Sequence, residues 1–493
     1  MSPAQKDHSA QSPSGQKASC VFYIAKRYFR GHSGGALHVR ATENEIKSMT
    51  EEAKPKPLFL TGEKALDLWR QGRDAWNRKI DRQKVEIISF TNVDFAAERY
   101  FSPQLSFAGY HFGNGDVKFS GVTFGDGEID FSKATFGDGE IDFSGVTFGK
   151  GKVNFSNATF GKGDVNFTRA NFGIGDVNFT RTSFGNGDLN FSRATFSGGK
   201  VIFSRATLRD GEVNFSNATF DDCTIFLNET KFSQLRFRPK AIKSSHIRAN
   251  GLSIKNLAVL FIPLSAERLE FFDLHGASFD GPLIVSGNLD IVPDLRDTKF
   301  SHQVELSRLS VKLRRAWQGF SWLPKLYRVT EDPTDSSRLR RLKEIAETNK
   351  DHQAALRFSA DENRARRWIE TSWFGSVLDM AFSACSNYGQ SILRPFVALF
   401  LLTAASIGLY KKLAVTADVE WWTGLGWGQS LLLSISNSLP FLPQSRELRK
   451  TAQDALYSND PSFWVDALMI GQGVFSFAFL FLIGLGLRNR FRL

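Results

Sequence analysis

Cysteine is scarce in this chain, and no catalytic signature is present. The three cysteines, Cys20, Cys223 and Cys385, lie far apart and form no CxxC pair, which argues against a disulfide framework and indicates reduced thiols in a cytoplasmic setting. The eight histidines show no metal-ligand spacing. No GxSxG, P-loop or HExxH motif occurs. The sequence therefore predicts a non-enzymatic protein without a cofactor or a bound metal.

A secretory leader and an excess of acid are also lacking. No apolar run precedes a cleavage site near the N-terminus, so no signal peptide is expected. Lys and Arg number 62 against 51 Asp and Glu, which gives a net charge of +11 and favours anionic partners such as a lipid surface or nucleic acid. Residues 1–60 are polar at their start and carry Pro55 and Pro57, so we expect this region to be disordered or irregular.

Phenylalanine is abundant, with 46 residues, and it repeats every 12 residues from Phe95 to Leu227. A second aromatic or aliphatic residue stands five places after each Phe of the main series. The main series is Phe95, Phe107, Phe119, Phe131, Phe143, Phe155, Phe167, Phe179, Phe191, Phe203 and Phe215. Such a fixed period is typical of a solenoid, because each unit is too small to bury its own apolar side and stacking buries it.

Each period splits into five plus seven residues. Val153–Asn157 is one five-residue unit, Ala158–Lys162 is the next, and Gly163 and Asp164 are two extra residues. Two periods would make a coil of 24 residues, with glycine bulges at two opposite corners. Glycine suits such bulges because they often need a positive φ angle.

The small residue two places before the Phe and the hydroxyl directly after it, as in Val153 and Ser156 around Phe155, resemble the pentapeptide-repeat family. The resemblance covers about residues 85–311. It implies a mainly β fold, a right-handed quadrilateral β-helix in which each five-residue unit forms one side of a square coil. The Gly-x-Gly extension departs from the family's ten residues per pair of sides.

Helical patterns flank the repeats. An apolar stripe at three- and four-residue spacing, from Leu66 to Ile80, predicts a helix within residues 61–84 that caps the first coil. After the repeats, residues 312–390 are expected to form an α-helical hairpin and a juxtamembrane segment. The hairpin ends in a basic stretch, Arg364–Arg367, which we expect to face lipid headgroups.

Residues 391–493 form the expected membrane domain. Transmembrane helices are predicted at about 392–411 and 467–487, of which the second can cross ~30 Å of hydrocarbon at ~1.5 Å per residue. Between them, residues 427–443 are short and broken by proline, which predicts a re-entrant or interfacial segment. Arginine-rich flanks place both termini and the repeats in the cytoplasm by the positive-inside rule.

Four further stretches resemble a bacterial group of membrane-anchored pentapeptide-repeat proteins with two C-terminal transmembrane helices. They are Trp69–Asn77, Leu342–Glu362, the Tyr-Gly-x-Ser-x-x-Arg-Pro pattern in Asn387–Pro395, and the basic end Gly484–Arg492. The resemblance implies a multi-pass protein of the bacterial inner membrane. It indicates architecture better than activity, because the function of this family is poorly specified.

Arginine recurs at one repeat position, and the charges of the repeats are segregated. Residues 116–142 hold seven acids and two bases, whereas residues 150–209 hold nine bases and three acids. The recurring arginines are Arg169, Arg181, Arg193 and Arg205. In a 24-residue coil they would stack in two pairs, and stacked like charges indicate a possible binding site for an anion or an acidic protein partner. Simple solvation of these charges is the favoured interpretation, and no nucleic-acid partner is expected.

The Gly-x-Gly corners are followed by a position that is mostly acidic, as in calcium-binding β-rolls. Lys152 and Lys200 occupy that position without any change in the frame, and the period differs from the nonapeptide of calcium rolls. The pattern therefore favours solvated corners over calcium sites.

A short segment between the two predicted spans carries Ser434, Ser436, Asn437 and Pro440, where a two-span channel would have its pore helix. No Thr-Val-Gly-Tyr-Gly-like filter follows, so potassium selectivity is not expected. A degenerate pore and a plain re-entrant anchor remain as interpretations.

These patterns together predict a membrane-anchored pentapeptide-repeat protein that acts as a cytoplasmic interaction scaffold. Its expected partners are the lipid bilayer and an unidentified protein. The alternative is a channel-like transport protein with two spans and a degenerate pore segment per chain. A pore of that kind needs several chains around an axis, so a homo-oligomer would favour the alternative.

Overall fold

The computed structural model describes residues 57–100, 104–243, 246–263, 269–317, 328–414, 426–439, 441, 443–458 and 461–491. The region expected to be irregular therefore lies outside the described residues except for 57–60. These residues belong to strand β1 (Pro57–Thr61).

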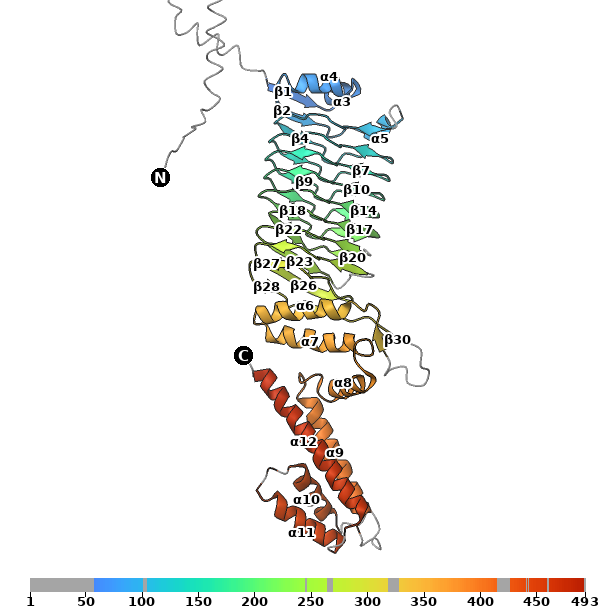
Figure 1. The fold of residues 1–493 in the computed structure, drawn as a ribbon. Helices are drawn as coiled ribbons and strands as arrows, with labels where there is room; N and C mark the ends of the chain where they lie inside the picture. The colour runs from blue at the N-terminus through green and yellow to red at the C-terminus, as the bar shows by residue number, and fades with distance from the viewer. Residues whose placement is uncertain are drawn as a thin grey trace, which may run out of the picture. The chain divides into compact units, whose positions relative to one another are not determined.

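Parallel strands form a β-solenoid of about ten turns, seen as stacked coils in Figure 1. Its longest sheet contains β1, β2 (Lys84–Ser89), β4 (Asp116–Lys118), β6 (Ile141–Asp142), β9 (Val165–Asn166), β12 (Leu189–Asn190), β15 (Glu212–Asn214), β19 (Gln234–Phe237), β23 (Ala258–Ile262), β26 (Leu283–Leu289), β28 (Val304–Glu305) and β29 (Leu309–Val311). A second sheet contains β3 (Leu105–Ser106), β5 (Ile129–Asp130), β7 (Val153–Asn154), β10 (Val177–Asn178), β14 (Gly199–Ile202), β17 (Cys223–Phe226), β21 (His246–Arg248) and β24 (Phe271–Asp273).

Two narrower faces complete the coil. One contains β8 (Thr159–Phe160), β11 (Ser183–Phe184), β18 (Lys231–Phe232), β22 (Ser253–Ile254), β25 (Ser278–Phe279) and β27 (Lys299–Phe300). The other contains β13 (Thr195–Phe196), β16 (Thr219–Asp221) and β20 (Ala241–Lys243), and single bridges such as Asn171 to Thr195 extend it toward the N-terminus. The chain visits all four faces in each turn, so the expected quadrilateral solenoid is confirmed.

The register confirms the predicted coil length. Val153 pairs with Val177, and the hydrogen bond from the Lys200 amide to Asp176 joins residues 24 apart. Later coils are less regular, since Val213 pairs with Leu235 across a separation of 22 residues. The strict sequence period ends where the coil length begins to vary.

The core is a ladder of stacked rings. Phe131 and Phe155 on neighbouring coils lie 4.8 Å apart between ring centroids with an interplanar angle of 2°. Phe143, on the opposite face, meets Phe131 edge-on at 5.6 Å. Each of these three rings is fully buried. Burying a ring of this size contributes on the order of 2 kcal/mol, and the preferred stacking and edge-on geometries add to that value.

Where one capping helix was expected within residues 61–84, the structure has two, α3 (Glu63–Arg70) and α4 (Arg73–Ile80). Gly72, with φ of 88°, separates them, because this conformation ends a helix and glycine adopts it without strain. The indole of Trp76 in α4 donates a hydrogen bond to the carbonyl of His111 at 2.7 Å. These helices therefore cover the first coils, and a short third helix, α5 (Phe95–Glu98), follows.

The C-terminal end of the solenoid is covered by the predicted hairpin, α6 (Asp335–Thr348) and α7 (His352–Arg366). A two-stranded antiparallel ribbon, β30 (Arg315–Trp317) and β31 (Arg328–Thr330), precedes it. The Asn349 amide exchanges two hydrogen bonds with the backbone of Val304, at 2.9 and 3.2 Å. These bonds satisfy an edge strand that no further coil pairs with.

Five helices complete the chain: α8 (Trp373–Ser386), α9 (Leu393–Lys412), α10 (Trp427–Ser438), α11 (Ser445–Tyr457) and α12 (Phe463–Phe491). Two of them, α9 and α12, are long and apolar enough to cross a membrane. The sequence did not predict α8 or α11, and α10 lies within residues 427–443, the segment expected to be re-entrant or interfacial. Pro440 lies outside the described residues.

The glycine corners generate a stability prediction. A Cβ at Gly163 would lie 2.0 Å from the carbonyl oxygen of Gly139 on the neighbouring coil. Because backbone must move to relieve that clash, Gly163→Ala should lower the free energy of unfolding by about 1–3 kcal/mol. Thermal unfolding of the detergent-solubilised protein, followed by circular dichroism, measures this loss.

The matched control is Gly121→Asn. Gly121 has φ of +70°, a Cβ added there would meet no atom within 4 Å, and Asn157 already adopts φ of 58° at the equivalent place. We expect this variant to unfold at nearly the same temperature as the parent. Equal losses in the two variants would contradict the proposed packing of the corners.

Candidate functional site

The recurring arginines occupy corners of the later coils in a left-handed backbone conformation. They are Arg169 (φ 59°), Arg181 (φ 57°), Arg193 (φ 61°) and Arg205 (φ 62°), and all four are exposed. This conformation costs a residue with a Cβ roughly 1–2 kcal/mol. The same repeat position holds Gly145 and Asn157 in other coils, which are residue types that tolerate it, and also Lys133 (φ 56°), which like arginine does not favour it. Arginine is therefore present at these corners against the local backbone preference.

The arginines form two columns, each spanning neighbouring coils. Arg169 lies one coil from Arg193, and Arg181 lies one coil from Arg205, because the amide of each earlier arginine bonds to the residue just before the later one. The rings beneath the two columns stack at 4.9 and 4.8 Å. Positive charge thus repeats about every 5 Å on two opposite corners of the solenoid.

One of the four arginines has an ionic partner. Arg205 donates to Glu229 at 2.9 Å, and this hydrogen bond lowers the pKa of the Glu229 carboxyl. In the part of the chain that the structure describes, Arg169, Arg181 and Arg193 form no ion pair. Two unit charges ~5 Å apart repel by about 1 kcal/mol even in water. These three side chains therefore present positive charge that an anionic group could neutralise.

The acidic corner residues have a structural role. Asp164 accepts a hydrogen bond at 2.8 Å from the backbone amide of Asp188, which is the equivalent residue one coil later. Asp176 accepts in the same way from Lys200, also at 2.8 Å. A lysine at this position still donates its backbone amide to the acidic residue of the preceding coil. Its side chain cannot accept the corresponding hydrogen bond from the amide of the next coil. This role explains the acidic preference without a bound cation.

The segment expected to form a pore or a re-entrant anchor turns its polar side chains into the helix bundle. Gln472 of α12 donates to the hydroxyls of Ser434 and Ser438, at 2.8 and 2.9 Å, and is 2% exposed. Its side-chain oxygen accepts from Tyr410 of α9 at 2.7 Å and from Asn437 at 3.2 Å. We call these five residues the Gln472 cluster, and they join α9, α10 and α12.

Ser436 donates to the carbonyl of Leu433 in its own helix at 3.0 Å, and Pro440 lies outside the described residues. Ser434, Ser436 and Asn437 are buried. Their side chains thus make hydrogen bonds within one chain.

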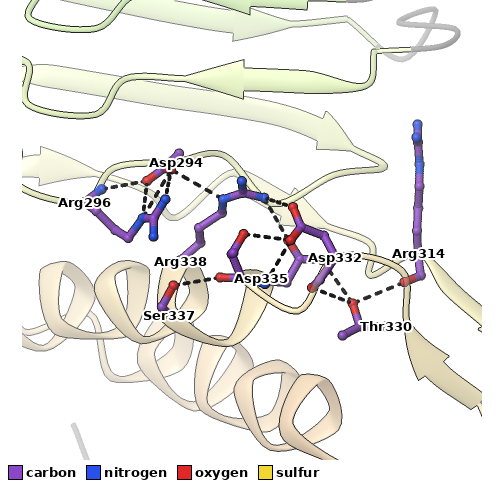
Figure 2. Close-up of polar contacts among 9 residues, drawn as sticks. Asp294, Arg296, Arg314, Thr330, Asp332, Asp335, Ser337 and Arg338 are labelled. Carbon is purple, nitrogen blue, oxygen red and sulfur yellow. Dashed lines mark hydrogen bonds and ion pairs between the residues drawn. The ribbon is translucent and has the colours of Figure 1, made fainter. Parts of the chain in front are cut away.

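A buried ionic cluster joins the solenoid to the hairpin (Figure 2). Arg338 of α6 is 8% exposed, and Figure 2 shows it between Asp294 and a pair of carboxylates, Asp332 and Asp335. Its terminal nitrogen lies 2.7 Å from Asp332 and 3.1 Å from Asp335, while its Nε lies 3.5 Å from Asp294. Arg296 donates to Asp294 from the other side at 2.6 Å. Sequence patterns gave no signal for this cluster, because its members come from two segments, 294–296 and 332–338, that are far apart in the chain.

The pKa values in this cluster shift in opposite directions. Burial raises the pKa of Asp294, but the hydrogen bonds from Arg296 and the charge of Arg338 outweigh it, so the pKa lies below its usual value. The pKa of Asp332 is also lowered. Burial raises it, but the hydrogen bonds from Thr334 and the charge of Arg338 outweigh that effect. At Asp335, burial and the neighbouring Asp332 raise the pKa. Asp294 and Asp332 are therefore held ionised by their partners.

Comparison with known proteins yields no relative. No protein-family model, no curated protein and no solved structure matches this chain. The interpretation of these sites therefore depends on the repeat pattern and on the contacts within the chain.

The junction cluster predicts a pH-dependent change. Carboxyls with lowered pKa values stabilise the fold above the pKa of the unfolded chain, near 4, and this contribution is lost as pH falls through the lower folded value. Asp294→Asn should therefore destabilise the α6 junction by about 3 kcal/mol at pH 7 and by clearly less at pH 3. Hydrogen exchange of the α6 amides at the two pH values measures the difference.

Asp297→Asn is the matched control, because Asp297 is 79% exposed and its substitution should change α6 protection by less than about 0.5 kcal/mol. If Asp294→Asn reduces the protection of the α6 amides equally at both pH values, charge at this position does not stabilise the junction.

The Gln472 cluster predicts a local destabilisation. Gln472→Leu removes the acceptor of Tyr410 and the donor to Ser434, which leaves buried polar groups unpaired at about 1–3 kcal/mol. We expect faster hydrogen exchange in α10, while Val474→Leu, at a position that is 62% exposed on the same helix, leaves exchange unchanged. Unchanged exchange in both variants would show that the cluster does not hold α10 in place.

Proposed function

We propose that this chain is a non-catalytic, membrane-anchored member of the pentapeptide-repeat family that acts as an interaction scaffold on the cytoplasmic side of a bacterial inner membrane. The solenoid supplies a long regular surface, and the C-terminal helices supply the anchor. In this proposal the arginine columns bind an acidic surface of a protein partner.

Membrane anchoring is supported by how α9 and α12 distribute their side chains. Val474 and Phe477 of α12 are 62% and 68% exposed, whereas Gln472 on the same helix is 2% exposed. A core helix of a water-soluble protein shows the reverse arrangement, with apolar residues inside. Polar residues that face the bundle and apolar residues that face outward suit a lipid environment.

Partner binding is supported by one observation above all, the arginines held in left-handed conformation. A position that serves only to turn the chain is best filled by glycine or asparagine, as at Gly145 and Asn157. Sparsely populated backbone conformations that are retained with a bulky side chain point to a use for that side chain. Two columns of exposed guanidinium groups match carboxylates, which arginine binds with paired hydrogen bonds.

The test replaces all four arginines by asparagine. This variant (R169N/R181N/R193N/R205N) removes four charges while placing at each corner a residue that tolerates the left-handed conformation, so its melting temperature should be no lower than that of the parent. Capture of partners from native membranes and cytosol, identified by mass spectrometry, should lose the acidic partner at least tenfold. Raising the salt concentration should weaken capture by the parent in the same way, because exposed charges are screened.

The control variant, K150Q/K152Q/K200Q, removes three exposed lysines from the glycine corners of the same coils. It should retain the partner if the arginine columns bind it specifically. Identical partner sets for the parent and the asparagine variant would refute the proposed role of the arginines.

A further inference from the structure

Helix α8 has an exposed apolar face. Trp373, Phe374 and Leu378 are 70%, 66% and 54% exposed. They lie within one and a half turns, and Ala381 continues their face one turn later. Water-soluble surfaces rarely leave such a cluster uncovered, and large exposed apolar patches mark sites that bind a membrane or a protein.

The charged side chain of α8 points away from the apolar face, toward the end of α7. Asp379 is the single charged residue of this helix, and its carboxylate binds Arg367 at 2.7 Å and the hydroxyl of Tyr388 at 3.0 Å. Arg367 also donates to Tyr388 at 2.8 Å. The polar side of α8 is thus fixed to the end of α7 and to the turn after α8. Its apolar side carries no charge.

Arginines surround this junction in excess over acids. Arg364 pairs with Asp361 at 2.6 Å, and Arg367 pairs with Asp379. Arg315 and Arg328 lie on the paired strands β30 and β31, and burial together with the positive charges of Arg364, Arg367 and Arg328 lowers the pKa of Arg315. Within the described residues, Arg315 and Arg328 form no ion pair. The cluster therefore keeps a net positive charge.

The turn after α8 connects this helix to both candidate spans. Asn387 has φ of 50° and ends α8, and α9 begins six residues later at Leu393. Asn489, near the basic end of α12, donates to the carbonyl of Gly389 at 3.1 Å. Helix α8 is thus joined through this turn to the ends of two helices that are apolar enough to cross a bilayer.

We propose that α8 is an in-plane membrane helix, with its Trp373, Phe374 and Leu378 face buried at the headgroup–acyl boundary and with Arg315 and Arg328 against anionic lipid headgroups. This inference rests on the proposed membrane anchoring. An amphipathic helix of this kind buries its apolar face about 5–10 Å below the headgroups, and nearby basic residues strengthen binding to anionic lipids. A lipid surface fits better than a protein partner, because the exposed side of α8 is apolar and uncharged while the junction that holds α8 has a net positive charge.

Three reporter positions test the proposal in nanodiscs. A fluorophore sensitive to polarity is attached to a cysteine introduced by Phe374→Cys, Val474→Cys or Ile174→Cys, the last being a 59% exposed residue of the solenoid. The background carries Cys20→Ala and Cys385→Ala, whereas Cys223 is retained because it is 2% exposed. Lipids with a nitroxide at a shallow or a deep acyl position then quench the fluorophore according to its depth. The nanodiscs contain phosphatidylglycerol and phosphatidylcholine.

The expected result is at least twofold stronger quenching by the shallow than by the deep nitroxide at position 374, strong quenching at position 474, and none at position 174. Arg315→Gln with Arg328→Gln should reduce the shallow quenching at position 374 at least twofold. Unchanged quenching in that variant would overturn the role of the two arginines.

Three other outcomes separate the possible failures. If position 474 is quenched but position 374 behaves like position 174, the in-plane helix is wrong while membrane anchoring stands. If position 374 is shielded from water but unquenched by either lipid, a second copy or another protein covers α8, and the lipid proposal is again wrong. If position 474 is not quenched, the anchoring itself fails.

Discussion

Stacking of one coil on the next is the constraint on which this structure depends. Each side of a coil holds only about two residues in strand conformation, so its hydrogen bonds and its apolar contacts come from the coils above and below. The Phe rings repeat at 4.8 Å in the middle of the regular part because the backbones repeat at the spacing of β-strands. No coil is stable alone, and both ends need covers. Trp76 supplies one at the N-terminal end, and Asn349 and Arg338 supply the other.

Much of this fold could be predicted from the sequence, because periodic features report on periodic contacts. The 12-residue period predicted the 24-residue coil, and long apolar runs predicted α9 and α12. Elements that depend on single residues were missed. Gly72 divides the first capping segment into two helices, and α8 and α11 lie in segments that were interpreted only as a juxtamembrane stretch and a connection between the spans. Their positions are determined by tertiary contacts that no local pattern encodes.

The candidate sites also divide into features that the sequence period predicts and features that only the folded structure shows. The arginine columns follow from the period, yet their left-handed φ angles do not, since arginine is not a residue type that predicts this conformation. Gln472 was recognisable as an isolated polar residue in an apolar helix, but its partners on α9 and α10 could only be found in three dimensions. The Arg338 cluster left no sequence signal. Ionic clusters need partners at short distance, and that distance is created by folding.

The distribution of polar groups reverses between the two halves of the chain. In the solenoid, the Phe rings are inside and the arginines outside, as an aqueous environment requires. In the C-terminal helices, Gln472 is inside and Val474 outside. Residues 373–394 lie at the change between these two arrangements, where α8 exposes apolar residues on one side and binds Arg367 on the other. Because the interior of the regular coils is filled by packed Phe rings, the proposed binding of a partner and of lipid is assigned to the exposed corners and to this transition.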